Sequence, residues 1–298
     1  MELKEALKKG PVTGRELYEK TGHSIFSLWK SCYSSDDVLV RMIDRPYLRF
    51  DRRVEGFARI SPSLEREFLT YTVIGLARDI QKIEKKMKEL DESIKKISEE
   101  KLETSKRAIQ DVLERLGESG GEIEAGACFI IGGDVPLQMA HSDPRPEVST
   151  GKMVAGSDLD IVVILNDDFK EALERSLDDA IYDVKYQLLT RPTRGEEIDY
   201  IIKRLSAFKE QAEFDTFEHM VACKIIDEGQ FLWGNSALYE RAISILMKNN
   251  IPKKLKELKS KALKQRENII KELLLMSELS EEAYIKMFTT TEEFGEIF

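Results

Sequence analysis

The stretch Gly156–Leu165, GSDLDIVVIL, begins with two aspartates one residue apart and continues as an uninterrupted apolar run. The apolar part, Ile161–Leu165, has the length and the β-branched composition of a buried strand. Because side chains at i and i+2 of a strand point to the same face, Asp158 and Asp160 are expected to lie side by side. Two ionised carboxylates this close repel each other unless a cation or solvent separates them. The stretch therefore indicates either a metal site or a solvated strand end.

Composition describes a chain that folds and carries its charge unevenly. Its 298 residues are 42% hydrophobic and 34% charged, enough for two or three domains. The net charge is −9, yet residues 1–60 hold 12 Lys and Arg against 9 Asp and Glu. This asymmetry favours contact with a polyanion through the N-terminal part alone.

Cysteine usage and hydropathy indicate a cytoplasmic protein. Cys32, Cys128 and Cys223 lie far apart and form no CxxC pair, which is typical of buried, reduced thiols and not of a disulfide framework or a zinc site. The opening MELKEALKKG lacks the apolar core of a signal peptide, and no stretch of 18 apolar residues occurs. We therefore expect no membrane partner.

Residues 1–62 show three short helical patterns followed by strand-like runs VLVRMI, YLRFD and VEGFARIS. This order resembles a winged helix-turn-helix domain, which implies nucleic-acid binding. The arginines expected to contact phosphates on the ribbon are Arg41, Arg45, Arg49, Arg52 and Arg53. A small α+β cap that binds protein fits the same pattern.

Residues 63–118 are predicted to form one long helix. Apolar residues spaced alternately three and four apart make a heptad seam, namely Val73, Leu76, Ile80, Ile83, Met87, Leu90, Ile94 and Ile97. Such a seam is typical of a coiled coil. It predicts either a homodimer through residues 73–97 or packing on the apolar stripe of a helix at 253–276. Residues 236–298 are expected to be a C-terminal helical region.

Residues 119–235 alternate strands and helices, which predicts an α/β or α+β domain. A short buried strand, Ala127–Ile131, ends in Gly132-Gly133, and a polar insertion at 134–156 precedes the strand with the aspartates. The whole chain is therefore expected to be mixed α+β, with a winged-helix-like domain, a long helix, an α/β core and C-terminal helices.

Other proteins with paired aspartates fit less well. In haloacid-dehalogenase phosphatases the apolar strand precedes the aspartates, whereas here it follows them. An EF-hand needs further oxygen ligands and a glycine where Ile161-Val162-Val163 stands. A glycosyltransferase DxD motif stays open.

Taken together, Gly132-Gly133, Ser157-Asp158-Leu159-Asp160-Ile161 and the later Asp199 resemble the polymerase-β-type nucleotidyltransferase superfamily. Asp199 is preferred to Glu197 as the third carboxylate because apolar residues flank it. The segment Ile225–Gly234 is similar to the one that closes the minimal and aminoglycoside-type cores. The resemblance implies that Asp158, Asp160 and Asp199 are catalytic and hold two Mg²⁺ or Mn²⁺ ions. It also implies that Gly132, Gly133 and Ser157 bind the nucleotide, an NTP for which ATP is the first choice.

The expected activity is transfer of an NMP to an acceptor hydroxyl with release of pyrophosphate. Three alternatives stay open. They are a winged-helix regulator that binds nucleotide without turnover, a structural protein assembled by the heptad helix, and a metal site that cleaves phosphodiesters, which the lack of a metal-binding histidine disfavours. The insertion is longer than the family's usual loop, with 24 residues between Gly133 and Asp158. Its Arg145 and Lys152 either reach a triphosphate or belong to a surface loop. The basic N-terminal part favours a nucleic-acid acceptor over a small drug.

Overall fold

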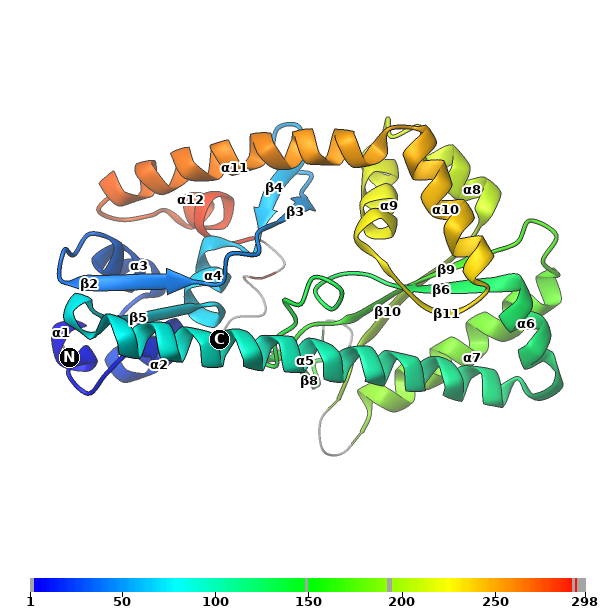
Figure 1. Cartoon of the computed structure of the whole chain (residues 1–298), viewed down its shortest axis with the longest axis horizontal. Coiled ribbons are helices and arrows are strands. Elements are labelled where there is room, and N and C mark those ends of the chain that lie inside the picture. The colour runs from blue at the N-terminus through cyan, green and yellow to red at the C-terminus, as the bar shows by residue number, and fades with distance from the viewer. Residues whose placement is uncertain (1–2, 148–149, 192–194, 291–292, 294–298) are drawn as a thin grey trace. The chain divides into compact units, whose positions relative to one another are not determined.

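The structure is a computed structural model that describes residues 3–147, 150–191, 195–290 and 293. The chain is mixed α+β, as expected, and divides into two compact units, Met1–Ser93 with Glu257–Phe298 and Ile94–Lys256 (Figure 1). Positions 148–149 of the predicted insertion and the end of the predicted C-terminal region lie outside the described residues. No helix within the described ranges is long and apolar enough to cross a bilayer.

The first unit combines short helices with two small sheets. Its elements are α1 (Leu3–Leu7), β1 (Val12–Thr13), α2 (Gly14–Thr21), α3 (Ile25–Tyr33), β2 (Val38–Met42), β3 (Tyr47–Phe50), β4 (Ala58–Ser61), α4 (Leu64–Thr70), β5 (Thr72–Leu76), η1 (Ala77–Asp79), the start of α5 (Ile80–Arg115), most of α11 (Ile251–Leu275), α12 (Glu281–Ala283) and the π-turn η3 (Tyr284–Phe288). One antiparallel sheet has the order β1-β5-β2, and β3 pairs with β4.

The three short helices expected near the N-terminus are present as α1, α2 and α3. Thr13 caps α2 in a capping box with Glu16, and the Ser24 hydroxyl caps α3. Trp29 of α3 is buried and packs edge-on against Phe288 of η3, so the apolar face of α3 belongs to the core of this unit.

The prediction of one helix over residues 63–118 is wrong in its first part. Strand β5 lies between α4 and α5 and pairs with both β1 and β2. Its run Thr72-Val73-Ile74 is β-branched, which favours a pleated strand over a helix. Val73 and Leu76, the first two members of the predicted seam, are therefore strand residues.

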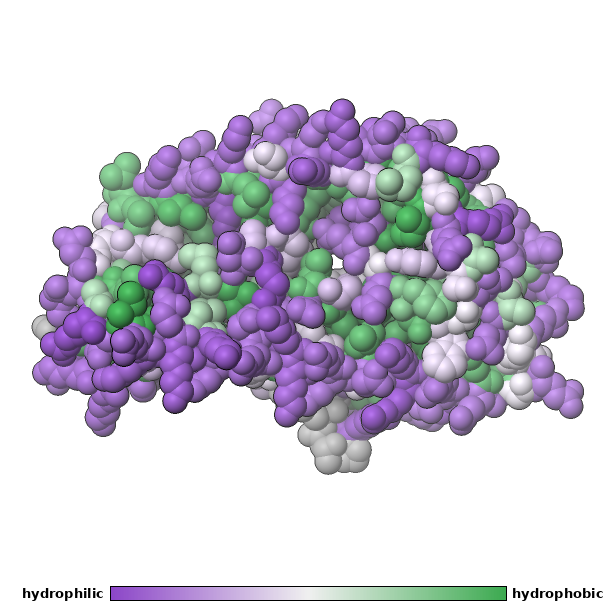
Figure 2. All heavy atoms as spheres, in the orientation of Figure 1, coloured by the Kyte–Doolittle hydropathy of each residue, from purple (hydrophilic) through white to green (hydrophobic). Residues whose placement is uncertain are grey.

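Two seam positions on α5 are buried within the chain itself. Ile83 and Ile94 are 0% and 4% exposed. A Cβ placed on Gly75 of β5 would lie 2.6 Å from the Ile83 side chain, so Ile83 packs closely on the sheet. The side of α5 turned to the viewer is hydrophilic (Figure 2). The helix also carries exposed Lys–Glu pairs four residues apart, such as Lys88–Glu92 at 3.7 Å.

The second unit is built around a four-stranded sheet. Its elements are the end of α5, η2 (Gly117–Ser119), α6 (Gly120–Gly126), β6 (Ala127–Ile131), β7 (Pro144–Pro146), β8 (Met153–Ala155), β9 (Leu159–Leu165), α7 (Glu171–Leu189), β10 (Ile198–Arg204), α8 (Leu205–Gln211), α9 (Phe217–Glu228), β11 (Gln230–Gly234), α10 (Ser236–Lys248) and the start of α11. The strand order is β10-β9-β6-β11. Strands β9 and β10 are parallel and α7 connects them, whereas the other pairs are antiparallel.

Helices cover both faces of this sheet. Figure 1 shows α7 and the end of α5 on one side and α8, α9 and α10 on the other. Ile161, Val163 and Leu165 of β9 are buried in one core with Val112 of α5 and Leu177 of α7. Burial on both faces explains why β9 is a continuous apolar run and not an alternating one.

The polar insertion at 134–156 contains two short strands. Strands β7 and β8 form a short antiparallel hairpin in which Arg145 is the register partner of Val154. The Val154 side chain is 2% exposed and the Arg145 side chain is also buried. Inward-facing residues thus anchor the hairpin on the rest of the unit.

Candidate functional site

The predicted carboxylates of the two parallel strands come together. Asp160 of β9 and Asp199 of β10 are register partners, and such partners project from the same face of a sheet. Both aspartates lie at the beginnings of their strands because the α7 crossover returns the chain to the same end of the sheet. Strand order and crossover therefore juxtapose two carboxylates that are distant in sequence.

The two glycines lie at the same end, because β6 runs antiparallel to β9 and finishes at Ile131, opposite Ile161. Gly133 has φ +66°, and a Cβ on it would lie 2.0 Å from Oδ2 of Asp160. Only glycine combines this backbone conformation with so close a carboxylate. Gly133 and Asp160 are thus direct neighbours.

The backbone N–H of Gly132 takes part in the sheet. Its N–H donates a 2.8 Å hydrogen bond to the Asp160 carbonyl and so continues the pairing of β6 with β9. The Gly132 N–H is therefore already used within the sheet, and nucleotide binding by Gly132 and Gly133 stays a prediction. Backbone donors for an anion would have to come from Gly133 onwards.

Asp158 is paired with an arginine from the insertion. Arg145 is 5% exposed, and its guanidinium forms ion pairs with Asp158 and, at 2.8 Å, with Glu197. Its Nε donates to the Gly156 carbonyl at 2.9 Å. Arg145 thus neutralises part of the charge of two carboxylates at the start of β9 and β10.

Asp199 also has a cationic partner. Lys185 Nζ of α7 lies 3.0 Å from Asp199 Oδ1. Strand β10 is an edge strand. The long Lys185 side chain, which comes from the helix on one face of the sheet, can therefore pass the edge and reach Asp199 on the other face. The Asp199 side chain is 53% exposed, which leaves it accessible to a ligand.

The chemistry of the donor set suits Mg²⁺ or Mn²⁺, since both ions prefer carboxylate oxygens. Among the described residues, no group of three or more His, Cys, Asp or Glu side chains is arranged to hold a metal ion. Two of the three predicted carboxylates are paired with cations of the protein, Asp158 with Arg145 and Asp199 with Lys185. A divalent cation held by Asp158 and Asp199 would have to replace these two ion pairs.

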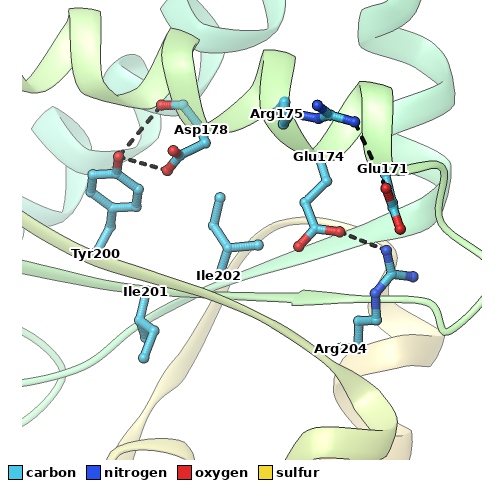
Figure 3. Close-up of a pocket in the computed structure, with 8 residues that line it drawn as sticks. All are labelled: Glu171, Glu174, Arg175, Asp178, Tyr200, Ile201, Ile202 and Arg204. Carbon is cyan, nitrogen blue, oxygen red and sulfur yellow. Dashed lines mark hydrogen bonds and ion pairs between the residues drawn. The ribbon is translucent and has the colours of Figure 1, made fainter.

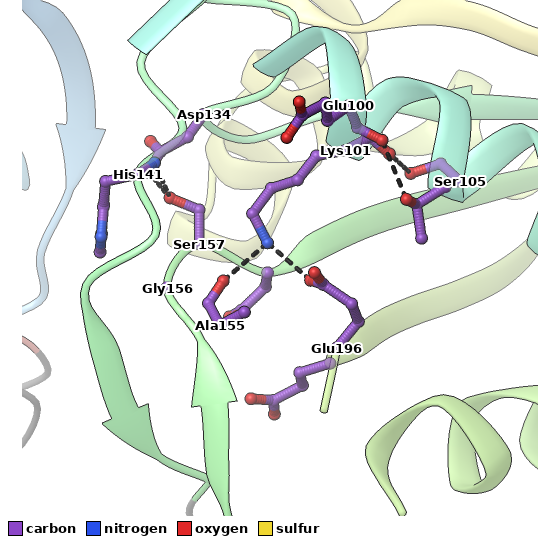
Figure 4. A network of polar contacts seen from close by, with 12 residues as sticks. Glu100, Lys101, Ser105, Asp134, His141, Ala155, Gly156, Ser157 and Glu196 are labelled. Atoms are coloured by element: carbon purple, nitrogen blue, oxygen red, sulfur yellow. Dashed lines mark hydrogen bonds and ion pairs between the residues drawn. The ribbon is translucent and has the colours of Figure 1, made fainter. Parts of the chain in front are cut away.

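Ser157 holds the turn that leads into β9. Its hydroxyl donates to Asp134 Oδ2 at 2.8 Å and accepts from the His141 N–H at 3.1 Å (Figure 4). Gly156 has φ +65°, and a Cβ there would lie 2.0 Å from the His141 carbonyl oxygen. The Ser157 hydroxyl, predicted to bind nucleotide, is therefore engaged within the protein, and it fixes the loop next to Gly133.

A buried lysine ties the insertion to α5. Lys101 is 4% exposed and donates to the Ala155 carbonyl at 2.8 Å and to Glu196 Oε2 at 2.6 Å (Figure 4). The Ala155 N–H in turn donates to the Gly195 carbonyl at 2.9 Å. Strand β8 is thereby fixed both to a helix and to the segment that leads into β10.

A pocket between α7 and β10 lies on the other face of the sheet. It is lined by Glu171, Glu174, Arg175, Asp178, Tyr200, Ile201, Ile202 and Arg204 (Figure 3). Arg204 pairs with Glu174 at 2.6 Å, and the Tyr200 hydroxyl donates to Asp178 Oδ1 at 2.8 Å. Burial raises the pKa of Tyr200. Tyr200, Ile202 and Arg204 alternate along β10 with Asp199, so their side chains lie on the opposite face of the sheet from the carboxylates.

Two of the N-terminal arginines expected to face phosphates contact carboxylates of their own unit. Arg41 Nε lies 2.9 Å from Glu84, and Arg45 pairs with Asp91. Both acidic partners belong to α5, so part of the predicted basic surface is neutralised. Nucleic-acid binding by residues 1–62 stays a prediction.

Comparison of the chain with protein-family models, with curated proteins and with solved structures finds no match in any of the three. The arguments for function therefore rest on the site itself. The sequence identifies Arg145 as a residue that could reach a ligand, but it does not predict the partners of this side chain. The sequence favours Asp199 over Glu197, and only the register of β9 with β10 reveals the place of Glu197 beside Asp158.

Proposed function

We propose that the unit Ile94–Lys256 is a metal-dependent nucleotidyltransferase that moves an NMP from an NTP to an acceptor hydroxyl and releases pyrophosphate. The observation that carries the proposal is the in-register pair Asp160–Asp199, with Gly133 directly against Asp160. Hard oxygen donors beside a glycine turn suit a complex of a divalent cation with a triphosphate.

Asp158, Asp160 and Asp199 would hold the cations. Bound Mg²⁺ or Mn²⁺ supplies charge neutralisation on the triphosphate and lowers the pKa of an acceptor hydroxyl. Asp199 is the most exposed of the three carboxylates and is suited to accept the acceptor's proton. The turn at Gly133 lets a phosphate approach the backbone without meeting a side chain.

A second candidate function is nucleotide binding without turnover, in a protein that regulates another process. The ion pair between Arg145 and Asp158 favours it, because a permanent arginine at this position would take the place of one cation. A protein that binds nucleotide through Asp160 and Gly133 alone would lack the full carboxylate set.

Pyrophosphate release from each NTP with Mg²⁺ or Mn²⁺, in the presence of total RNA and protein extracts, tests the proposal. Asp160→Asn and Asp199→Asn are expected to lower the rate by about 10² or more, the usual cost of removing a charge-stabilising group. Glu174→Gln, in the separate α7/β10 pocket, is the matched control and should keep the rate.

Full activity in both aspartate variants would show that the reaction belongs elsewhere. Isothermal titration of the NTPs distinguishes the second candidate, since nucleotide binding without any pyrophosphate release supports the regulator. Label transferred from an NTP to the RNA or to the protein fraction identifies the acceptor class.

A further inference from the structure

Arg145 is a buried charged group, 5% exposed, next to the candidate carboxylates. A guanidinium stays ionised at any physiological pH, so its burial is tolerated only with carboxylate and carbonyl partners. Its partners are Asp158, Glu197 and the Gly156 carbonyl. The Arg145 side chain thus contacts Asp158, a carboxylate that would bind a divalent cation in the proposed function.

The hairpin that carries Arg145 is held in place. Across its end, the Glu147 N–H donates to the Lys152 carbonyl at 2.8 Å. At its base, Lys101 binds the Ala155 carbonyl at 2.8 Å. Arg145 therefore comes from a fixed element, and its contact with Asp158 is built into the fold.

Glu197 allows Arg145 to release Asp158 without becoming an isolated charge. It is buried, 8% exposed, and stays within 2.8 Å of the guanidinium. If Asp158 turned to a cation, Arg145 would keep Glu197 and the Gly156 carbonyl as partners. Loss of one partner is tolerable, whereas loss of all three would leave a buried unpaired charge.

We infer that Arg145 is a built-in competitor of the divalent cation at Asp158, one that holds this carboxylate in the absence of metal and weakens cation binding. This inference rests on the proposed function, because it takes Asp158 as a cation ligand. A guanidinium on the ligand repels an arriving cation and must be displaced from the carboxylate oxygen before the cation binds. Occupation of the site then depends on the added attraction of a triphosphate.

Mn²⁺ binding measured by electron paramagnetic resonance, without nucleotide, tests the inference independently of turnover. Arg145→Gln keeps amide donors for Glu197 and Gly156 but removes the charge, and should tighten Mn²⁺ binding by about tenfold or more. Arg145→Lys keeps the charge and should bind Mn²⁺ like the unmodified protein. Arg204→Gln, which removes an arginine on the other face of the sheet, should leave the affinity unchanged.

The outcomes separate this inference from the proposed function. If Asp160→Asn weakens Mn²⁺ binding but Arg145→Gln leaves it unchanged, Arg145 is a structural ion pair only and the inference is overturned. If neither Asp158→Asn nor Asp160→Asn changes Mn²⁺ binding, the proposed metal site itself is overturned. Thermal unfolding of each variant checks that it folds. If Arg145→Gln does not fold, the double variant Arg145→Met with Glu197→Gln takes its place, because it removes the charge and its buried partner together. This double variant should bind Mn²⁺ more tightly than the unmodified protein.

Discussion

Asp160 and Asp199 face each other in register across the parallel strand pair β9–β10 of the second unit. The sheet thereby places two carboxylates side by side at one end, next to a glycine whose missing side chain leaves room for Asp160. The neighbouring pair, Asp158 and Glu197, is bridged by Arg145. The Arg145 bridge is buried, whereas Asp199, which pairs with Lys185, is 53% exposed.

This contrast predicts different effects of two substitutions on the same strand. Asp199→Asn should change the free energy of unfolding by less than about 1 kcal/mol, because its pair with Lys185 is exposed. Glu197→Gln should lower it by about 3 kcal/mol, because the charge of Arg145 stays buried with one carboxylate fewer. Urea unfolding of both variants measures the difference, and equal effects would contradict the burial of the Arg145–Glu197 pair.

Gly133 is expected to be intolerant of any side chain. Gly133→Ala combines an unfavourable positive φ with the contact to Asp160, and should lower the free energy of unfolding by about 2 kcal/mol or more. Gly151 has the same φ of +66°, but a Cβ on Gly151 would meet no atom within 4 Å, so Gly151→Ala should cost only about 1 kcal/mol. Chemical denaturation of the two variants isolates the steric part, and equal losses would rule out the close approach of Asp160.

The buried lysine on α5 predicts a large stability effect far from the carboxylates. Lys101→Met should lower the free energy of unfolding by about 3 kcal/mol, because it leaves Glu196 and the Ala155 carbonyl without their partner. Lys106→Met, at an exposed pair with Glu103 on the same helix, should have no measurable effect. The double variant Lys101→Met with Glu196→Gln should recover part of the loss, and a double variant as unstable as the single one would speak against the ion pair.

The start of α5 predicts unequal roles for two positions of the heptad seam. Ile83→Ala should cost about 3 kcal/mol, because the side chain is 0% exposed against β5. Ile80, at the first residue of the helix, is 48% exposed, and Ile80→Ala should cost less than about 1 kcal/mol. Thermal unfolding compares the two variants. Similar losses of stability in the two variants, together with a melting temperature of the unmodified protein that rises with protein concentration, would instead support a coiled-coil dimer through residues 73–97.

The three thiols predict a loss of stability at alkaline pH. Burial raises the pKa of Cys32 and Cys128 to about 12 and that of Cys223 to about 11. A thiol in the unfolded chain has a pKa of about 8.5, so above that pH the unfolded chain releases protons that the folded chain keeps. The free energy of unfolding therefore falls by up to about 1.4 kcal/mol per pH unit for each thiol. Urea unfolding at pH 7.5 to 10 measures the slope.

Replacing the thiols supplies the control. A Cys128→Ala variant should show a smaller decrease of stability with pH, since one of the three titrating groups is gone. The folded protein should also resist thiol reagents at pH 8, where buried thiols stay protonated. Rapid labelling of Cys128 in the folded protein, or an unchanged slope in the variant, would contradict its burial.

Local sequence patterns predict much of the second unit correctly. The strand at 127–131 and the strand after Asp158 form where the apolar runs stand, because a short β-branched run between turn residues has few other stable forms. The helical region expected from residue 236 begins there, with α10 at Ser236–Lys248. The prediction of the long helix fails at its start. Val73 and Leu76 lie three residues apart, a spacing that fits a strand buried on both faces as well as a helix.

The identity of the candidate carboxylates is therefore accessible from the chain alone, because the residue types and their alternation depend only on local geometry. The partners of these carboxylates are not. Arg145 meets Asp158, and Lys185 meets Asp199, only after a crossover and a hairpin have folded. Pairing between distant residues is decided by strand order and register, which are set by burial of the whole sheet and not by any short stretch.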